Sequence, residues 1–160
     1  MAYVKYRGLF FRMNRLLLTL ALFLSIGFSR RTVVKLATLA PEGTEWHGML
    51  IEMGQEWKKK SKKSVHLRVY PGGVIGDERD MVRKMRIGQI HAAAITTEGL
   101  SEIVPDFSAY YVPLAFQNSE DVMSVTEALL PSLEKQLDEQ GFKLLHIGEL
   151  GWAYWFTSKP

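Results

Sequence analysis

The 160-residue sequence contains no cysteine. This absence excludes disulfide bonds, thiolate nucleophiles, thiolate metal sites and membrane attachment through a lipid-modified cysteine. The sequence also lacks a long apolar run, because the stretch from Leu16 to Leu24 is interrupted by Thr19 and is shorter than the ~20 residues that a membrane-spanning helix needs. We therefore expect a soluble protein with one modest hydrophobic core.

Acidic residues are absent from the first 29 positions, which do contain cations. The four cations are Lys5, Arg7, Arg12 and Arg15. A basic segment followed by a short apolar stretch is the layout of a secretory signal peptide, so we expect cleavage near Ser29 and a periplasmic mature protein. Two alternatives remain open, an uncleaved N-terminal anchor and a translation start at Met13.

The positive charge of the chain belongs to this leader. Beyond residue 29 there are 16 Lys and Arg residues and 17 Asp and Glu residues, whereas the whole chain has a formal net charge of +3. A nucleic-acid partner would need a basic face on the mature domain. The one candidate is the lysine-rich stretch at 58–63, which has no interleaved aromatics and lies where a helix should end, a place that favours cations. We therefore expect no nucleic-acid partner.

Patterns typical of catalysis and metal binding are also missing. The four histidines, at 47, 66, 91 and 146, show no His-x-x-x-His spacing and are interpreted as surface or packed residues. No serine lies in a Gly-x-Ser-x-Gly context, and no Gly-Lys-Ser/Thr follows the glycine-rich segment 71–76. The sequence thus predicts no enzymatic activity, no metal and no cofactor.

Hydrophobic periodicity predicts alternating strands and helices, which is typical of an α/β fold with a parallel sheet. We expect strands at 32–39, 65–70 and 90–95, the first of them buried on both faces. Further extended segments are predicted at 110–116, 142–147 and 153–157. Each of these ranges is rich in β-branched, aromatic or small apolar residues.

Capping residues predict where the helices begin and end. Thr44 is expected to cap a first helix whose stripe Trp46, Met49, Met53 and Trp57 packs on the sheet. Asp77 is expected to cap a second helix that ends at Gly88. A short helical segment should follow residues 96–99 and close at Pro105. A third helix is predicted from Ser119 to Gly141, with a break or restart at Pro131.

The candidate ligand site lies at the carboxyl ends of the strands, where open α/β sheets bind ligands. The loops at 40–44, 71–77 and 96–99 are rich in glycine, proline and hydroxyl residues, and two of them lead into helix N-termini, whose free N–H groups favour an anion. The candidates on these loops are Pro41, Glu42, Trp46, Gly73, Asp77, Thr96 and Thr97. A tight turn without a ligand remains the alternative for 71–76.

The neighbouring acidic residues Asp77, Glu78 and Asp80 are interpreted as a helix-start cluster that offsets the helix dipole. A pair of general acid and base is the second choice.

Five segments in register resemble the DctP-type solute receptors of TRAP transporters. They are ATLAPEGTEW at 37–46, YPGGVIGDER at 70–79, GQIHAAAITT at 88–97, VPLAF at 112–116 and GWAYWFTSKP at 151–160. The resemblance implies a two-lobe periplasmic solute-binding protein whose α/β lobes close on a ligand in the cleft. It also implies that mainly the first lobe is present, at 30–130, between the signal peptide at 1–29 and the start of a truncated second lobe at 131–160.

The implied function is capture of a small organic acid or similar polar solute and its delivery to TRAP-type membrane permease subunits. The family commonly has an arginine near the ligand carboxylate two residues after the glycine of the last motif, and the matching residue here is Ala153. Its neighbours Trp152 and Tyr154 are interpreted either as a stacking wall or as core and hinge packing, and all three residues join the candidate ligand site. Two alternatives are a periplasmic ligand-sensing input module and a truncated fragment without a function of its own.

The leader generates the first prediction. N-terminal sequencing of the protein recovered from a periplasmic extract should find a start near residue 30, because the basic and apolar segments before it are typical of a cleaved signal. Recovery only from the cytoplasm, with Met1 or Met13 intact, would contradict export.

Overall fold

The computed structural model describes residues 31–151 and 156–158. Three strands, β1 (Thr32–Thr38), β2 (Val65–Tyr70) and β3 (Ala92–Ala94), form a parallel sheet in the order β2-β1-β3. In this sheet Thr32 lies opposite Val65 and Leu36 lies opposite Ala92. The predicted strands at 32–39 and 65–70 are confirmed, and the one predicted at 90–95 is confirmed over its middle three residues.

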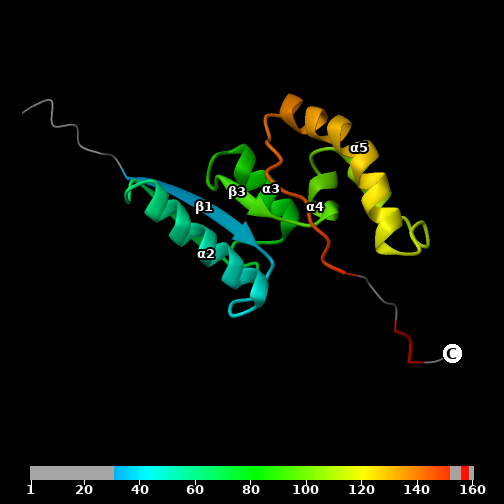
Figure 1. The fold of residues 1–160 in the computed structure, drawn as a ribbon, viewed down its shortest axis with the longest axis horizontal. Coiled ribbons are helices and arrows are strands. Elements are labelled where there is room, and N and C mark those ends of the chain that lie inside the picture. The colour runs from blue at the N-terminus through cyan, green and yellow to red at the C-terminus, as the bar shows by residue number, and fades with distance from the viewer. Residues whose placement is uncertain (1–30, 152–155, 159–160) are drawn as a thin grey trace, which may run out of the picture.

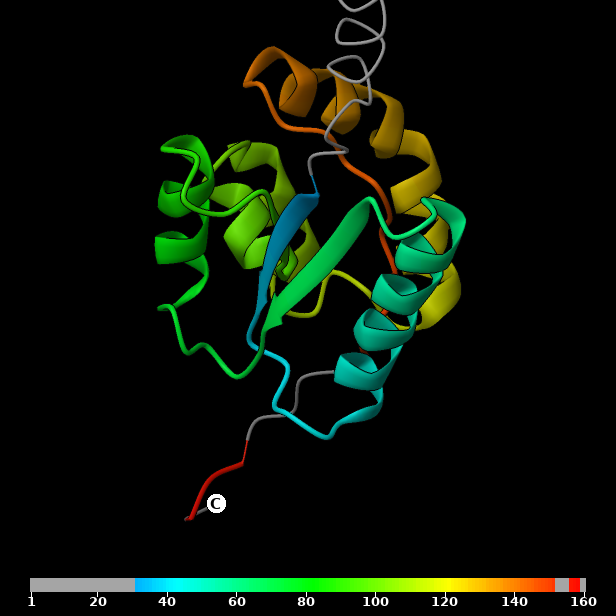
Figure 2. The same ribbon diagram turned by 90° about the vertical axis from the view of Figure 1, so that its left-hand side faces the viewer.

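Helices connect the parallel strands, as this topology requires. α2 (Glu45–Lys60) links β1 to β2, and α3 (Glu78–Arg86) links β2 to β3. α2 and α3 lie on opposite sides of the sheet (Figures 1 and 2). After β3 come the short helix α4 (Thr97–Ser101), the 3-10 helix η1 (Pro105–Tyr111) and the long helix α5 (Ser119–Glu139).

Side-chain caps set the helix starts. The Thr44 hydroxyl accepts a hydrogen bond from the His47 N–H at 3.4 Å, and the Asp77 carboxylate accepts one from the Asp80 N–H at 2.8 Å. Both predicted caps are confirmed, because each satisfies a backbone donor that the first turn leaves without a partner. At the other end of α3, Gly88 follows the last turn with a φ of 71°, and the predicted end of this helix is confirmed.

The buried side chains form two clusters. One lies between the sheet and α3 and contains Ala37, Met81 and Ile90. The other joins α3, the segment around η1 and α5, and contains Val82, Ile103, Val104, Phe107, Leu133 and Leu137. Since α3 contributes Met81 to the first cluster and Val82 to the second, it links the sheet to the helical layer.

α5 continues through Pro131, so the predicted break or restart there is wrong. Proline removes a backbone donor and disfavours a helix interior, but burial on its C-terminal side holds the helix together. Leu133 and Leu137 are only 2% and 1% exposed and pack in the cluster with Phe107. The predicted boundary between residues 130 and 131 therefore falls inside α5, and the division into two lobes stays a prediction.

Two predicted extended segments are wrong. Residues 105–111 form η1, so the strand predicted at 110–116 is absent, and Leu114 has a φ of 61° that a strand does not allow. Pro105 starts this helix with its fixed φ, and Phe107 anchors it with a fully buried ring. Residues 142–147 run alongside the helices without pairing to any described strand.

Of the segment predicted at 153–157, residues 153–155 lie outside the described residues, and 156 and 157 are not in a strand.

The contact face of α2 also differs from the prediction. α2 has no fully buried residue, and Trp46 and Met49 are 44% and 45% exposed. The helix packs on the edge strand β2 and approaches it closely at Gly54, where an added Cβ would lie 3.0 Å from the Leu67 Cβ.

The first half of β1 is open on one face, since Val33 is 45% exposed. Burial on both faces is thus wrong for that half, whereas the last three residues of β1, Leu36 to Thr38, are buried as predicted.

The packing of α5 predicts that Leu137→Ala lowers the free energy of unfolding by about 3 kcal/mol, because it leaves a cavity in the core cluster. Met123→Ala on the same helix should change it by less than about 0.5 kcal/mol, since Met123 is 59% exposed. Urea unfolding of both variants measures the difference. Equal effects would show that the C-terminal part of α5 does not pack on this core.

Candidate ligand-binding site

The loops that follow β1 and β2 are joined by backbone hydrogen bonds. The Gly72 N–H donates to the Ala40 carbonyl oxygen at 2.9 Å, and the Gly73 N–H donates to the Thr38 carbonyl oxygen at 3.0 Å. Gly73 has a φ of 68°, and an added Cβ there would lie 3.2 Å from the Leu39 side chain. Glycine is required here for both the positive φ and the close approach. The parallel sheet thus brings two of the three predicted loops together.

The turn after β2 is held closed from within. The Gly76 N–H donates to the Gly73 carbonyl oxygen at 2.9 Å, and the Lys84 ammonium donates to the Ile75 carbonyl oxygen. Gly76 has a φ of 117°, and an added Cβ would lie 2.5 Å from the Asp80 side chain. This compact turn delivers the chain to Asp77 and the start of α3.

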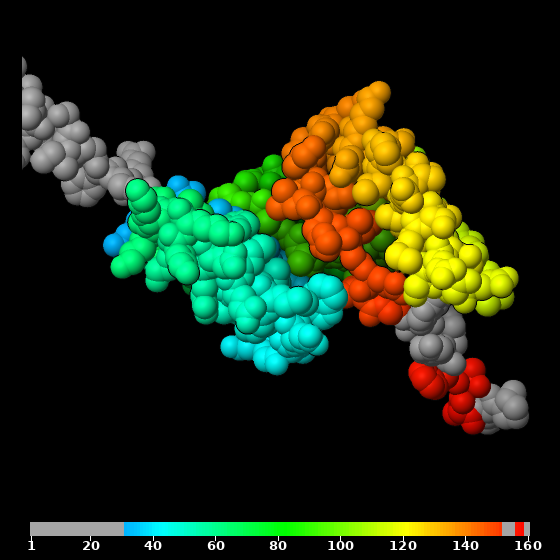
Figure 3. Space-filling model, in the orientation of Figure 1, coloured from blue at the N-terminus to red at the C-terminus, as the bar shows by residue number. Residues whose placement is uncertain are grey.

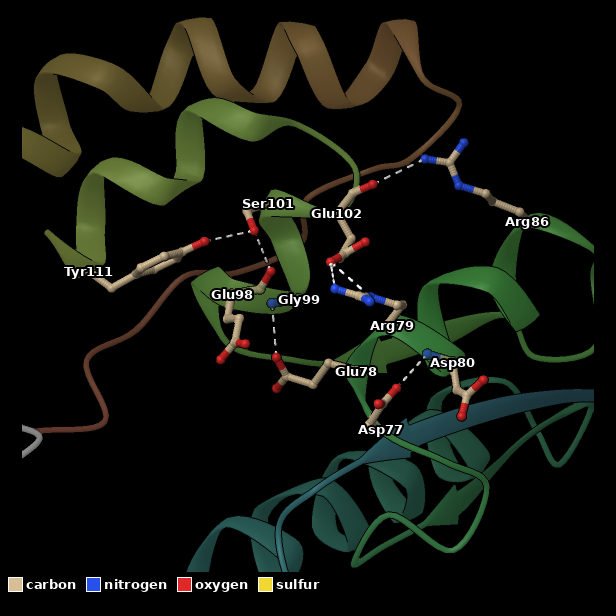
Figure 4. Close-up of polar contacts among 10 residues, drawn as sticks. All are labelled: Asp77, Glu78, Arg79, Asp80, Arg86, Glu98, Gly99, Ser101, Glu102 and Tyr111. Carbon is tan, nitrogen blue, oxygen red and sulfur yellow. Dashed lines mark hydrogen bonds and ion pairs between the residues drawn. The ribbon is translucent and has the colours of Figure 1, made fainter.

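The third loop is joined to α3 by the carboxylate of Glu78. Oε1 of Glu78 accepts a hydrogen bond from the Thr96 N–H at 2.8 Å, and Oε2 accepts from the Thr96 hydroxyl at 2.7 Å and the Gly99 N–H at 2.9 Å. Figure 4 shows the Glu78 side chain reaching from α3 to Gly99 in α4. Glu78 is only 9% exposed. Two of the backbone donors predicted to favour an anionic ligand at 96–99, the N–H groups of Thr96 and Gly99, are therefore bound by the protein's own carboxylate.

The role of Glu78 was missed from the sequence. The sequence indicates a helix-start cluster of Asp77, Glu78 and Asp80 that offsets the helix dipole, and all three residues do lie at the start of α3. Glu78 instead turns inward, and its partners lie 18 and 21 residues further along the chain. No local pattern identifies a bond of that separation. The nearest signal is Gly99, whose missing side chain leaves room for the carboxylate.

The predicted site residues occupy different environments. Pro41, Glu42, Trp46, Asp77 and Thr96 are exposed, and Gly73 and Thr97 are half-buried. The loops at 40–44 and 71–77 touch each other, whereas Thr96 is tied to α3 through Glu78. Trp152, Ala153 and Tyr154 lie outside the described residues. Contact between any of these residues and a ligand stays a prediction.

Two exposed ion pairs involve arginines of α3 beside this edge. The Arg79 guanidinium donates two hydrogen bonds to Oε1 of Glu102, at 3.0 and 2.8 Å (Figure 4), and this contact raises the pKa of Arg79. The Arg83 guanidinium donates to the Asp80 carboxylate at 2.7 Å, and this hydrogen bond holds the pKa of Asp80 below its usual value. Two of the arginines on α3 are therefore engaged by carboxylates of the protein.

Two further features lie away from the carboxyl edge of the sheet. A groove of about 210 Å³ runs between α2 and β2, and none of its lining residues is a predicted site residue. In the space-filling view, the side chains of α2 and those of α5 form two separate masses with the middle of the chain set back between them (Figure 3). Within 31–151 and 156–158, no three His, Asp or Glu side chains gather as metal ligands.

The comparisons with known proteins connect this fold to a family. Residues 36–160 match the family model for the bacterial extracellular solute-binding proteins of family 7, DctP. The chain belongs to this family. The resemblance found in the sequence is thereby confirmed. No helix among the described residues is both long and apolar enough to cross a membrane.

Individual relatives of this family 7 chain agree with that assignment. A solute-binding protein of Roseobacter denitrificans is 28% identical over 116 residues, which are 72% of this chain and 35% of the relative. The structure of the same protein, a TRAP periplasmic solute-binding protein solved with bound L-galactonate, is similar with a TM-score of 0.61, 25% identity and coverage of 69% of this chain and 37% of that one.

A second structure, of a TRAP periplasmic solute-binding protein from Citrobacter koseri with bound D-glucuronate, has a TM-score of 0.58, 24% identity and coverage of 67% of this chain and 36% of that one. The chain therefore spans little more than a third of the length of these relatives. It has an α/β fold with a parallel sheet that corresponds to one lobe of such a receptor.

The pair on α3 predicts a pH effect. Since the hydrogen bond from Arg83 lowers the pKa of Asp80, Arg83→Ala should return that pKa toward the usual value of about 3.9. The stabilising effect of a lowered pKa is present above about pH 3.9 and is lost as the pH falls through the lowered pKa.

An NMR titration of the Asp80 carboxyl measures this change, with Arg86→Ala on the same helix as control. An unchanged pKa in Arg83→Ala, or an equal rise in both variants, would contradict the assignment.

Proposed function

We propose that this chain is an extracytoplasmic receptor that captures a small organic acid and presents it to a TRAP-type membrane permease. The observation that carries the proposal is the family match over residues 36–160 together with the α/β fold of its described part. Relatives with this fold were solved with sugar acids, namely L-galactonate and D-glucuronate. We extend that ligand class, a polyhydroxylated monocarboxylic acid, to this chain.

The carboxyl edge of the sheet suits such a ligand. The loops at 40–44 and 71–77 meet there, and they expose Glu42 and Asp77, whose carboxylates accept hydrogen bonds from sugar hydroxyls. Trp46 lies in the first turn of α2, beside the first loop, and is 44% exposed. An exposed indole offers a flat apolar surface for the carbon face of a sugar. Binding and release, without a covalent step, is the chemistry that these groups support.

The place of action follows from the same family. Its members are extracellular solute-binding proteins, and the basic leader at 1–29 is the segment that would direct this chain to the periplasm. The partners we propose are the membrane subunits of a TRAP permease.

The affinity of this chain on its own should be low. One lobe leaves one side of the ligand in water and supplies part of its polar contacts, whereas a closed cleft buries most of the ligand surface. We therefore expect the 160-residue chain to bind sugar acids with a dissociation constant of about 1 mM or weaker.

An NMR titration with L-galactonate and D-glucuronate tests this proposal. The backbone amides of Gly43, Gly72 and Gly73 should shift, and those of the lysine-rich stretch at 58–63 should not. No shift at about 50 mM of either acid would overturn the proposed function, because binding weaker than this carries less than about 2 kcal/mol. Micromolar affinity would overturn the argument that one lobe is insufficient.

A pair of variants sharpens the test. Trp46→Ala should weaken binding of either sugar acid by about tenfold, which corresponds to the ~1.4 kcal/mol expected for an aromatic contact. Met49→Ala is the matched control, since it lies on the same helix with nearly the same exposure, 45% against 44%. Equal effects of the two substitutions would remove Trp46 from the site.

A further inference from the structure

Glu78 is a buried carboxylate without a cationic partner. Its side chain is 9% exposed, and no ion pair in residues 31–151 and 156–158 involves it. The nearest basic residue in sequence, Arg79, is paired with Glu102 instead. Burial of a charge is costly unless hydrogen bonds compensate it. For Glu78 the compensation comes from neutral donors alone.

Those donors are grouped at the start of α4. Two backbone N–H groups, of Thr96 and Gly99, and the Thr96 hydroxyl converge on the two carboxylate oxygens at 2.7–2.9 Å. Hydrogen bonds to a charged acceptor are stronger than neutral ones. Thr96 is held through two of its atoms, and its hydroxyl also caps α4 by accepting from the Glu98 N–H at 3.2 Å. One carboxylate therefore fixes both the end of β3 and the first turn of α4.

The packing around this carboxylate leaves no room for a second group. An added Cβ at Gly99 would lie 2.7 Å from Oε2 and 2.9 Å from Cβ of Glu78. Gly99 is itself buried and has no positive φ that would require glycine. Its small size is needed for the approach of the carboxylate, which is a second observation, independent of the hydrogen bonds, that this contact shapes the loop.

From these observations we infer that Glu78 is a positioning and specificity-determining residue of the ligand site. Its carboxylate permanently occupies the N–H groups of Thr96 and Gly99 and the Thr96 hydroxyl. It thereby orients Thr96 and Thr97 at the carboxyl edge and directs the acidic group of a ligand to another part of the protein. The effect on the position of a ligand's acidic group rests on the proposed function. The binding of the Glu78 carboxylate to Thr96 and Gly99, called the resident carboxylate below, does not depend on it.

Chemical rescue tests the resident carboxylate. Glu78→Ala removes Cγ and the carboxyl group, which together have the size and charge of acetate. The melting temperature of this variant should fall by roughly 10 °C. Acetate at about 0.2 M, compared with chloride at equal ionic strength and pH 7, should restore about half of that loss by binding to the folded state.

Matched variants distinguish rescue from a general salt effect. Glu98→Ala removes an exposed carboxylate from α4 itself, and acetate should not stabilise it more than chloride does. Glu78→Gln keeps the shape but turns an amide N–H₂ toward a donor, and Gly99→Ala keeps the carboxylate but displaces it. Both should melt below the wild type without rescue by acetate, because neither leaves space for it. These two variants keep the test decisive if Glu78→Ala does not fold.

Amide resonances provide the readout for specificity. In Glu78→Ala, acetate should shift the amides of Thr96 and Gly99. In the wild type, neither acetate nor L-galactonate should shift the Gly99 amide, even where L-galactonate shifts Gly72 and Gly73. Acetate that stabilises Glu78→Ala no more than chloride does, or a carboxylate that shifts Gly99 in the wild type, would overturn the inference. Failure of the proposed function would appear separately, as a lack of shifts at Gly72 and Gly73.

Discussion

The pairing of β1 with a parallel strand on each side is the constraint on which the rest of the described structure depends. β1 pairs with β2 over six residues and with β3 over three. Because the strands are parallel, the connections between them must be crossovers, here α2 and α3, and the three loops after the strands must leave from the same edge. The hydrogen bonds from Gly72 and Gly73 to the end of β1 then follow directly from this geometry. The topology of the sheet therefore places the loops of the candidate site, and the side chains on them come second.

Glu78 adds a second constraint at the same edge. The sheet alone places the loop after β3 near the start of α3, but backbone pairing ends at Ala94. From Thr96 to Gly99 the chain is instead held by one side chain from α3. Figure 4 shows that this contact and the Arg79–Glu102 pair join the same two helical segments, one from the interior and one at the surface. The buried contact of Glu78 contributes more to stability than the Arg79–Glu102 pair, since exposed ion pairs contribute little.

What the sequence predicts well is local. The caps Thr44 and Asp77, the glycine after α3 and the strands β1 and β2 each follow from neighbouring residues, and all are confirmed. The errors arise where distant residues decide. Burial of Leu133 and Leu137 overrides the helix-breaking tendency of Pro131, and residues 142–147 have strand-like composition but no described strand to pair with. The role of Glu78 depends on a loop 18 residues away, which periodicity cannot reveal.

Under the function that we propose, the charges at the carboxyl edge favour one end of a sugar acid over the other. Glu42, Asp77 and Glu98 are exposed there, while Arg79 and Arg83 are bound by Glu102 and Asp80. The N–H groups of Thr96 and Gly99 are bound by Glu78. A ligand carboxylate would therefore meet like charges and acceptors, whereas hydroxyl groups would find partners. The position that the family resemblance associates with an arginine is Ala153, which supplies no cation. If the ligand is the sugar acid that we propose, the described edge is suited to its polyol end, and its acidic end needs a cation from another part of the protein.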